Sequence, residues 1–230
     1  KIEVAVMLTA FYGLRRSEVV GLKWAAVDFE QNTIEICHTV TTVRLDGKEV
    51  LVESNGTKTK SSKRTLPLVP VFRERLLALQ EEQKENRKLC GRCYNKKYAD
   101  YICVDAMGNL LKPDYLSNSF QIILQNYHLR RIRFHDLRHT AATNMHQLTG
   151  DFYTVGEILG HTLKGIGISL GISTNLEAVT AQYVDVRLER KQSVLQTYHK
   201  ALQPKTTVTG KEAGQETSKK AKKKSSEMEL

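Results

Sequence analysis

The sequence has no long hydrophobic run, few cysteines and a shortage of acidic residues, and each shortage excludes a class of protein. No apolar stretch approaches the roughly 18 to 20 residues that span a bilayer, and residues 1–4 lead into a helical pattern rather than a signal peptide. Four cysteines among 230 residues do not make a disulfide scaffold, so we expect a chain that works in a reducing cytosol. The sequence lacks an initiating Met, and we expect a fragment of a longer protein.

The shortage of acidic residues leaves a basic chain. Lys and Arg number 35 against 25 Asp and Glu, which gives a net charge of +10 and a pI near 9.4. Such an excess favours a polyanionic partner, either nucleic acid or an anionic membrane surface. The sequence also lacks an acidic cluster of the kind that holds two catalytic metal ions. With 40% hydrophobic residues the chain has enough apolar side chains for a real core.

Hydrophobic periodicity predicts several helices. Apolar residues recur at helical spacing over residues 2–12, and this helix is expected to end at Gly13. Ser17 is predicted to be the N-cap of a short helix that runs through Trp24. Further helices are predicted over 72–89, 113–126, 134–147, 155–159, 175–183 and 188–202.

Strands are predicted in the first third of the chain. The density of β-branched residues over 33–45 favours one strand, Asp46 and Gly47 form a hairpin turn signal, and 48–53 is the returning strand. Residues 54–63 are polar and predict a loop, and 64–68 is a third strand. The segment 90–105 is predicted to be irregular with some strand character.

Two segments have the composition of chain without a packed core. Residues 164–173 hold several glycines and predict a mobile loop. From Pro204 onward there are seven Lys and four Glu with almost no large apolar residue, so this tail carries +3 and leaves +7 for the rest. We therefore predict a folded domain over 1–203 and a disordered basic tail over 204–230.

Three short stretches hold side chains that bind or attack phosphates. Arg15 follows a turn glycine, His135 and Arg138 lie three residues apart, and His161 follows a Leu-Gly pair. A guanidinium stays charged and binds two phosphate oxygens at once. Tyr183, further along, supplies a phenol that can act as a nucleophile.

Together these stretches resemble the catalytic domain of the tyrosine recombinases, or phage-type integrases. The run from Phe134 to Thr143 carries most of the resemblance. The resemblance implies an α+β fold, mostly α-helical with a small three-stranded antiparallel sheet, wrapped against duplex DNA. It also implies that one or two DNA-binding domains precede this one.

The resemblance assigns a role to each candidate residue. Arg15, Arg138 and His161 would stabilise the charge that develops on the phosphate, with Glu18 as a supporting carboxylate. Of the two neighbouring arginines, Arg15 rather than Arg16 would hold the active position. His135 would accept the proton of Tyr183, the nucleophile. A lysine in the loop 54–63 would protonate the leaving oxygen, with Lys58 the first choice and Lys60 the second. The reaction would need no cofactor and no metal.

The implied activity is site-specific cutting and rejoining of DNA through a 3′-phosphotyrosyl intermediate, for integration or excision of a mobile element. A type IB topoisomerase uses similar chemistry and is the alternative. The implied partner is double-stranded DNA with no membrane, and the implied assembly is a homotetramer on DNA that is a monomer when free. In this assembly the apolar residues Val194, Leu195 and Leu202 would dock on a neighbouring subunit. A bacterial or phage-encoded protein of the cytoplasm is expected.

Three further alternatives remain open. The gap of 22 residues between His161 and Tyr183 is longer than is usual in the family, and Tyr198 is a late alternative nucleophile. His135 and His139 are spaced like two ligands of a zinc-binding helix. Cys90 and Cys93, with Cys103 nearby, form most of a zinc site, but unpaired cysteines in an irregular insertion are the preferred interpretation.

Overall fold

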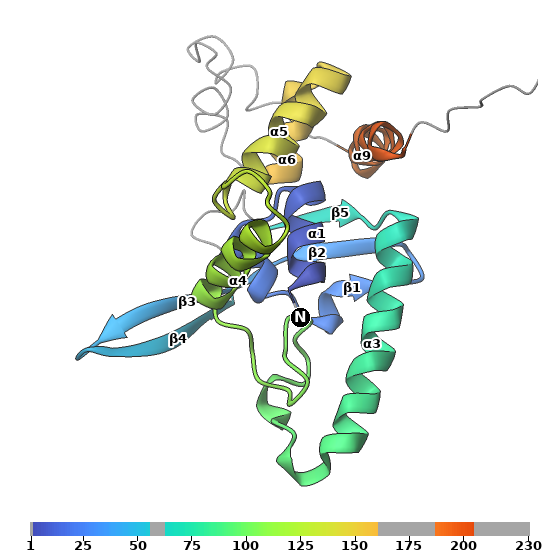
Figure 1. The fold of residues 1–230 in the computed structure, drawn as a ribbon. Coiled ribbons are helices and arrows are strands. Elements are labelled where there is room, and N and C mark those ends of the chain that lie inside the picture. Colours follow the sequence, from blue (N-terminus) through green and yellow to red (C-terminus); the bar gives the residue numbers. More distant parts are fainter. Residues whose placement is uncertain (1, 56–62, 161–186, 205–230) are drawn as a thin grey trace, which may run out of the picture.

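The computed structural model describes residues 2–55, 63–160 and 187–204, and more of them are helical than are in strands (Figure 1). Helix α1 (Glu3–Tyr12) lies at the centre with both faces packed, and it ends at Gly13 as predicted. Gly13 has a φ of 65°, and an added Cβ would collide with the side chain of Leu159. Glycine is therefore required where α1 ends against the last turn of another helix.

The second helix begins earlier and ends earlier than the sequence predicts. Helix α2 covers Arg16–Val20 with Arg15 as its N-cap, and Trp24–Ala26 forms a separate 3₁₀ turn. Ser17 is therefore not the N-cap. The carboxylate of Glu18 accepts a hydrogen bond from the backbone N–H of Arg15 at 2.9 Å. This is the contact that the side chain at the third helical position makes in a capping box.

The strands form two small antiparallel sheets rather than one. The first contains β1 (Val27–Asp28), β2 (Thr33–Ile36) and β5 (Arg64–Pro67) in the order β1-β2-β5. The second pairs β3 (His38–Leu45) with β4 (Lys48–Asn55). A three-stranded antiparallel sheet is present, but its strands are not the three that the sequence predicts.

The predicted single strand over 33–45 is wrong because its two halves have different partners. Residues before Cys37 pair with β1 and β5, whereas residues after it pair with β4. The backbone at His38, where the second half of this run begins, packs against Gly21, the C-cap residue of α2. A Cβ added at Gly21 would lie 2.7 Å from the His38 carbonyl oxygen. The hairpin turn at Asp46 and Gly47 is confirmed, with φ angles of 49° and 75°. In Figure 1 this hairpin projects away from the helices.

Two long helices flank this sheet region. Helix α3 covers Pro70–Cys90 and α4 covers Pro113–Asn126, each opened by a proline, and both confirm the predictions. Between them the chain makes two 3₁₀ turns, Gly91–Cys93 and Lys96–Tyr98, as the prediction of an irregular segment expects. All four cysteines of the sequence are free thiols.

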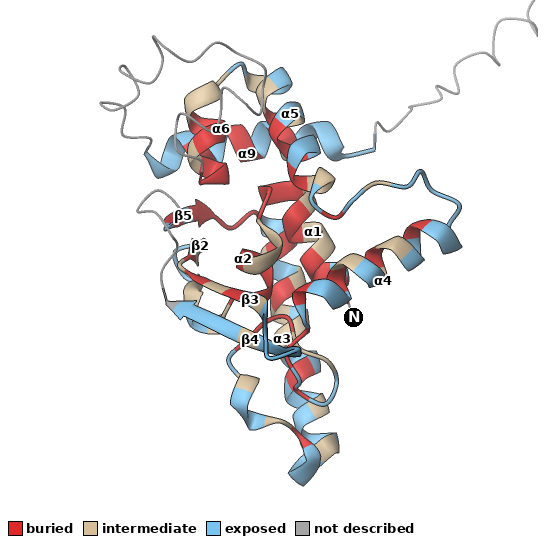
Figure 2. Cartoon of the chain, turned by 90° about the vertical axis from the view of Figure 1, so that its left-hand side faces the viewer, coloured by how far each residue is buried: buried red, intermediate tan, exposed pale blue. Residues whose placement is uncertain are grey.

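The C-terminal helices close the core. Helix α5 (Asp136–Thr149) packs against α1, α6 (Phe152–Leu159) packs against α5, and α9 (Leu188–Leu202) packs against α5, α6 and β5. Figure 2 shows buried residues concentrated where these helices meet α1 and the sheet. Among the described residues no helix is long and apolar enough to cross a membrane.

The apolar face of α9 lies on its own chain. Val194, Leu195 and Tyr198 are buried, and the ring of Tyr198 stacks on Phe11 with centroids 5.2 Å apart. Leu202 is 53% exposed. The sequence predicts that Val194 and Leu195 dock on a neighbouring subunit, and in this structure they instead cover the core of the same molecule.

Candidate active site

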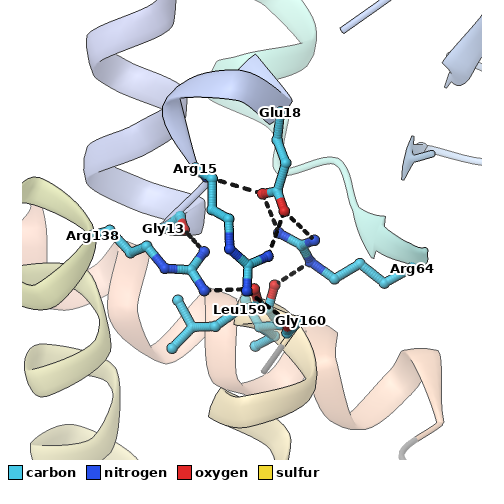
Figure 3. Close-up of polar contacts among 8 residues, drawn as sticks. Gly13, Arg15, Glu18, Arg64, Arg138, Leu159 and Gly160 are labelled. Carbon is cyan, nitrogen blue, oxygen red and sulfur yellow. Dashed lines mark hydrogen bonds and ion pairs between the residues drawn. The ribbon is translucent and has the colours of Figure 1, made fainter. Parts of the chain in front are cut away.

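Three guanidinium groups meet at the C-terminal end of α6 (Figure 3). They belong to Arg15 at the start of α2, Arg64 at the start of β5 and Arg138 on α5. Segments that are more than 100 residues apart in the sequence thus come together at one point. Arg15 and Arg138 are brought together as the sequence predicts.

Each arginine donates to a different carbonyl oxygen of the last turn of α6. Arg64 Nε donates to the oxygen of Ile158 at 2.6 Å, Arg138 Nη2 to that of Leu159 at 2.9 Å, and Arg15 Nη2 to that of Gly160 at 3.0 Å. The final carbonyls of a helix lack partners within the helix and lie at its negative end. The end of α6 is therefore a frame that holds three cations close together.

Arg138 is the most constrained member of this group after Arg64. Its side chain is buried, and Nη1 also donates to the carbonyl oxygen of Gly13. Burial, together with the charges of Arg15 and Arg64, lowers the pKa of Arg138 to about 9, although Glu18 opposes the shift. A guanidinium with that pKa is still mostly charged at neutral pH. Arg138 therefore supplies a fixed positive charge to the site.

Arg15 differs from Arg138 because its side chain remains 34% exposed. Its Nη1 donates to Glu18 Oε1 at 2.6 Å and its Nη2 to Gly160. Both contacts hold the planar group in one orientation while part of it faces outward. Arg15 is thus oriented by the protein and still accessible to an anion from outside.

Glu18 is a buried carboxylate that two arginines share. Arg64 Nη2 lies 3.0 Å from Oε2 and Arg64 Nη1 3.3 Å from Oε1, while Arg15 binds from the other side. Burial alone would raise the pKa of this carboxyl, but the charges and hydrogen bonds of Arg64 and Arg15 outweigh it and lower the pKa to about 2. Glu18 is therefore ionised at neutral pH.

This shift predicts how stability depends on pH. A carboxyl with a lowered pKa in the folded state stabilises the protein above its unfolded-state pKa, and this contribution is lost as the pH falls from about 4.5 towards 2. The shift corresponds to about 3 kcal/mol. Urea unfolding of Glu18→Gln is expected to give lower stability at pH 7 and a flatter decline below pH 4.5.

The matched control is Glu3→Gln. Glu3 also pairs with an arginine, Arg75, at 3.0 Å, but its side chain is 60% exposed. Exposed pairs contribute about 1 kcal/mol or less, so this variant should stay close to the wild type at pH 7. A Glu18→Gln protein as stable as Glu3→Gln would show that the buried carboxylate contributes little.

His135 lies at the start of α5, where it is the N-cap residue. His135 is exposed, whereas Arg138 one turn later is buried, so the two side chains have different environments although they are only three residues apart. Partial desolvation and the nearby His139, Arg138 and Arg133 lower the pKa of His135. The imidazole is therefore neutral at physiological pH and able to accept a proton.

His135 and His139 lie one helical turn apart with ring centroids 4.9 Å from each other. Within residues 2–55, 63–160 and 187–204, no group of three or more histidine, cysteine or acidic side chains is placed to hold a metal ion. The two-histidine spacing that suggests zinc thus has no third ligand among the described residues.

A basic hollow of about 670 Å³ lies beside His135. Its lining includes Arg16 from α2, Arg131 and Arg133 from the segment before α5, and polar residues of α4. Arg16 is held there by Asp114 and Ser117 at 3.0 and 2.8 Å. Positive charge thus continues from the arginine cluster across the neighbouring surface.

Four of the sequence-predicted candidates lie outside the described residues. They are Lys58, the second-choice Lys60, His161 and Tyr183. Gly160, whose carbonyl oxygen binds Arg15, directly precedes His161 in the sequence. The alternative nucleophile Tyr198 is described, and it is buried with its hydroxyl donating to the carbonyl oxygen of Ala10 at 3.3 Å. Burial raises the pKa of Tyr198, which makes this phenol a poor nucleophile.

Arg64 is the residue of the cluster that the sequence interpretation missed. It begins a strand and stands at the end of a run of lysines and serines, which suggests an exposed position. Its side chain is nevertheless only 2% exposed. Its partners, Glu18 and Ile158, lie 46 and 94 residues away, so no local pattern indicates them.

Comparison with known proteins gives a family match. Residues 2–166 match the model of a family described as the phage integrase family. A tyrosine recombinase XerC-like protein of Caldanaerobacter subterraneus subsp. tengcongensis is 30% identical over 182 residues, which cover 75% of this chain and 45% of the relative. The chain therefore spans less than half the length of that relative.

Solved structures with a similar fold include recombinases and a transposon integrase. The Tn1549 transposon integrase in complex with circular intermediate DNA superposes with a TM-score of 0.60 at 20% identity, over 79% of this chain and 58% of that one. The XerA recombinase gives a TM-score of 0.51 at 20% identity, over 79% and 55%. At this level of identity the likeness shows the fold.

Proposed function

Because this chain belongs to the phage integrase family, we propose that it is the catalytic domain of a tyrosine recombinase, which cuts and rejoins DNA strands at specific sites. The observation that carries the proposal is the pair Arg15 and Arg138, held on adjacent carbonyls of α6 with Arg15 still accessible. Two guanidiniums so fixed fit the two non-bridging oxygens of one phosphodiester.

The arginine pair is proposed to act on the transition state. When a nucleophile attacks a phosphodiester, negative charge grows on the non-bridging oxygens, and donors that are already in place stabilise this charge without rearranging. Arg138 is fixed by Gly13 and Leu159, and Arg15 by Glu18 and Gly160. His161, next to Gly160 in the sequence, is proposed as a third donor.

The proposed nucleophile is Tyr183. Its phenol oxygen forms a bond to phosphorus while the bond from phosphorus to the 5′ oxygen breaks. The phenol proton passes to His135, whose lowered pKa keeps it neutral and ready to accept, and Lys58, or Lys60, protonates the leaving 5′ oxygen. The 3′-phosphotyrosine keeps the energy of the broken bond, so a 5′-hydroxyl of another strand can reverse the step.

DNA is the proposed partner of the basic surface. The hollow lined by Arg16, Arg131 and Arg133 continues from the site and would follow the phosphate backbone. Binding through phosphates releases counterions and is therefore sensitive to salt. We propose that the reaction serves the integration or excision of a mobile element and takes place in the cytoplasm, where the DNA lies. The XerC-like relative is named a recombinase, which favours strand exchange over the relaxation of supercoils by a topoisomerase.

We propose that residues 1–203 form the catalytic domain and 204–230 a disordered basic tail, of which 205–230 lie outside the described residues. We also propose a monomer in solution that assembles as a tetramer on DNA. Since α9 covers the core of its own chain, assembly through α9 would require this helix to leave that position. Arg190–Asp151 and Lys191–Glu157 are the ion pairs that would break, with N–O distances of 2.5 and 3.9 Å.

Truncation after Arg187 tests this role of α9. Loss of Val194, Leu195 and Tyr198 uncovers apolar surface, so the thermal midpoint should fall by several degrees. Strand exchange and assembly on DNA, followed by gel shift and light scattering, should fall further than DNA affinity. Equal losses of assembly and affinity, or a stable tetramer without DNA, would contradict the proposal.

The proposed function is tested by covalent capture. The chain is incubated with a pool of nicked duplexes of random sequence, because the nick lets the cut end diffuse away and traps the intermediate. An SDS-stable protein–DNA adduct is expected, with or without EDTA, and sequencing of the captured DNA gives the target. If no adduct forms although DNA is bound, the chain is a DNA-binding module; loss of the adduct in EDTA alone would support the zinc interpretation.

A further inference from the structure

Arg64 is a buried cation to which the proposed reaction gives no role. It begins β5, and only 2% of its side chain is exposed. Removing a charge from water costs several kcal/mol unless the group is paired and hydrogen-bonded. Arg64 meets this condition through Glu18 and the carbonyl oxygen of Ile158. Both of these partners therefore help to hold the guanidinium in place.

These two partners also help to position the two proposed catalytic arginines, Arg15 and Arg138. The Glu18 carboxylate also holds Arg15, because it accepts hydrogen bonds from Arg15 Nη1 at 2.6 Å and from the Arg15 backbone N–H at 2.9 Å. Ile158 begins the row of three α6 carbonyls whose next two members hold Arg138 and Arg15. Arg64 thus joins the carboxylate on one side of the cluster to the helix end on the other.

The packing around Arg64 leaves little freedom of movement. A Cβ added at Gly160 would lie 2.7 Å from Arg64 Nη1 and 3.1 Å from its Cζ. Gly160 has a φ of 63° and ends α6, so the guanidinium lies directly against the helix C-cap. A shift of the Arg64 guanidinium would therefore move either Glu18 or the last turn of α6.

We propose that Arg64 is a positioning residue, which holds Glu18 and the end of α6 at a fixed separation so that Arg15 and Arg138 reach the same phosphate. The inference rests on the proposed function for its effect on cleavage. Because the Arg64 side chain is buried, it would act through Glu18 and α6 rather than by touching the phosphate. Displacements of about 1 Å in such a site lower rates by about 100-fold, so its loss should act on the rate of cleavage more than on DNA affinity.

The test compares Arg64→Met, Glu18→Leu and the double variant. Arg64→Met leaves buried Glu18 with Arg15 but without Arg64, and Glu18→Leu leaves buried Arg64 without the carboxylate of Glu18, so each should lower the thermal midpoint. The double variant removes both buried charges and should recover it. Cleavage of pre-bound nicked DNA should fall by about 100-fold in Arg64→Met and remain as low in the double variant as in Glu18→Leu. Affinity for the same DNA should change by less than about threefold.

Two more variants separate positioning from general stability. Arg64→Lys keeps a charge beside Glu18 but cannot also reach Ile158 in the same geometry, so its cleavage rate should fall between those of Arg64→Met and the wild type. Arg73→Met removes a half-buried arginine of α3 whose Nε donates to the Phe29 carbonyl oxygen at 3.4 Å. This control should cleave at the wild-type rate.

An NMR titration measures the positioning without any catalysis. In Arg64→Met the carboxyl of Glu18 loses its principal cation, so its pKa should rise from about 2, and the Arg15 Nε–H signal should shift and broaden. These changes in a protein whose wild type forms no adduct would support the positioning role and reject the proposed function.

Three results would overturn the inference. The first is wild-type cleavage by Arg64→Met, and the second is unchanged Glu18 and Arg15 signals in that variant. The third is recovery of both stability and cleavage in the double variant, which would make Arg64 a structural residue only.

Discussion

Replacement of Arg138 by lysine is expected to lower the rate of strand cleavage by about 100-fold or more. Arg138 donates in two directions, to the carbonyl oxygens of Gly13 and Leu159, and is proposed to bind the phosphate as well. The single ammonium of a lysine cannot reproduce this planar fork. Burial already lowers the pKa of Arg138 to about 9, and the same burial would lower the pKa of a lysine towards neutrality. The defect should therefore deepen as the pH rises through 7 to 8.

The measurement is single-turnover cleavage of DNA that is already bound, at several pH values. Arg133→Lys is the matched control, because Arg133 lies just before α5 in the sequence but is 80% exposed and pairs with Asp136 at 2.8 Å. This control should weaken DNA binding modestly and leave cleavage of bound DNA unchanged. If Arg138→Lys cleaves bound DNA at the wild-type rate, Arg138 positions the backbone rather than stabilising the transition state.

Replacement of Tyr183 by phenylalanine is expected to abolish the covalent adduct while leaving DNA affinity unchanged. The substitution removes one hydroxyl, and without the nucleophile no phosphotyrosyl bond can form. Gel shift with intact duplex and SDS gel electrophoresis with nicked duplex measure binding and adduct separately. The expected loss is complete within the detection limit.

Tyr198→Phe is the matched control for this experiment. Tyr198 is buried against Phe11, and its hydroxyl donates to the Ala10 carbonyl oxygen. Removal of this hydroxyl should therefore lower the stability somewhat, while the adduct should form as in the wild type. An undiminished adduct from Tyr183→Phe, together with its loss from Tyr198→Phe, would move the nucleophile to α9. That outcome would require α9 to leave the core before cleavage.

Local sequence signals predict several of the described helices well. The bounds of α4 and α9 agree with the periodicity of their apolar residues, and α1 ends at the glycine that the sequence indicates. In each case the information lies within a few residues of the chain: a proline at the start, a glycine at the end, or one continuous apolar face.

Features that depend on distant partners were not predictable in the same way. The β-branched run across Cys37 favours a strand throughout, but only the folded chain shows that β5 pairs with one half and β4 with the other. The spacing of apolar residues predicts the apolar face of α9, but it does not distinguish packing on a neighbouring subunit from packing on the core of the same chain.

In the candidate site, too, some residues are predictable from local motifs and others depend on distant partners. Arg15, His135 and Arg138 were identified from short motifs, and the structure brings the two arginines to one helix end. Arg64 has no motif of its own, because its importance comes from Glu18 and Ile158, which are distant in sequence. Chemistry that a family shares is readable from local residues, whereas the contacts that orient it come from the fold.

The most direct test of this account is to identify the bond in the captured adduct. The adduct is digested with protease and nuclease, and the remaining peptide is sequenced by mass spectrometry. We expect a single modified peptide in which the hydroxyl oxygen of Tyr183 carries the 3′-phosphate of the cut strand. A 5′-phosphate linkage, attachment at another residue, or the same adduct from an Arg15→Ala and Arg138→Ala double variant would contradict it.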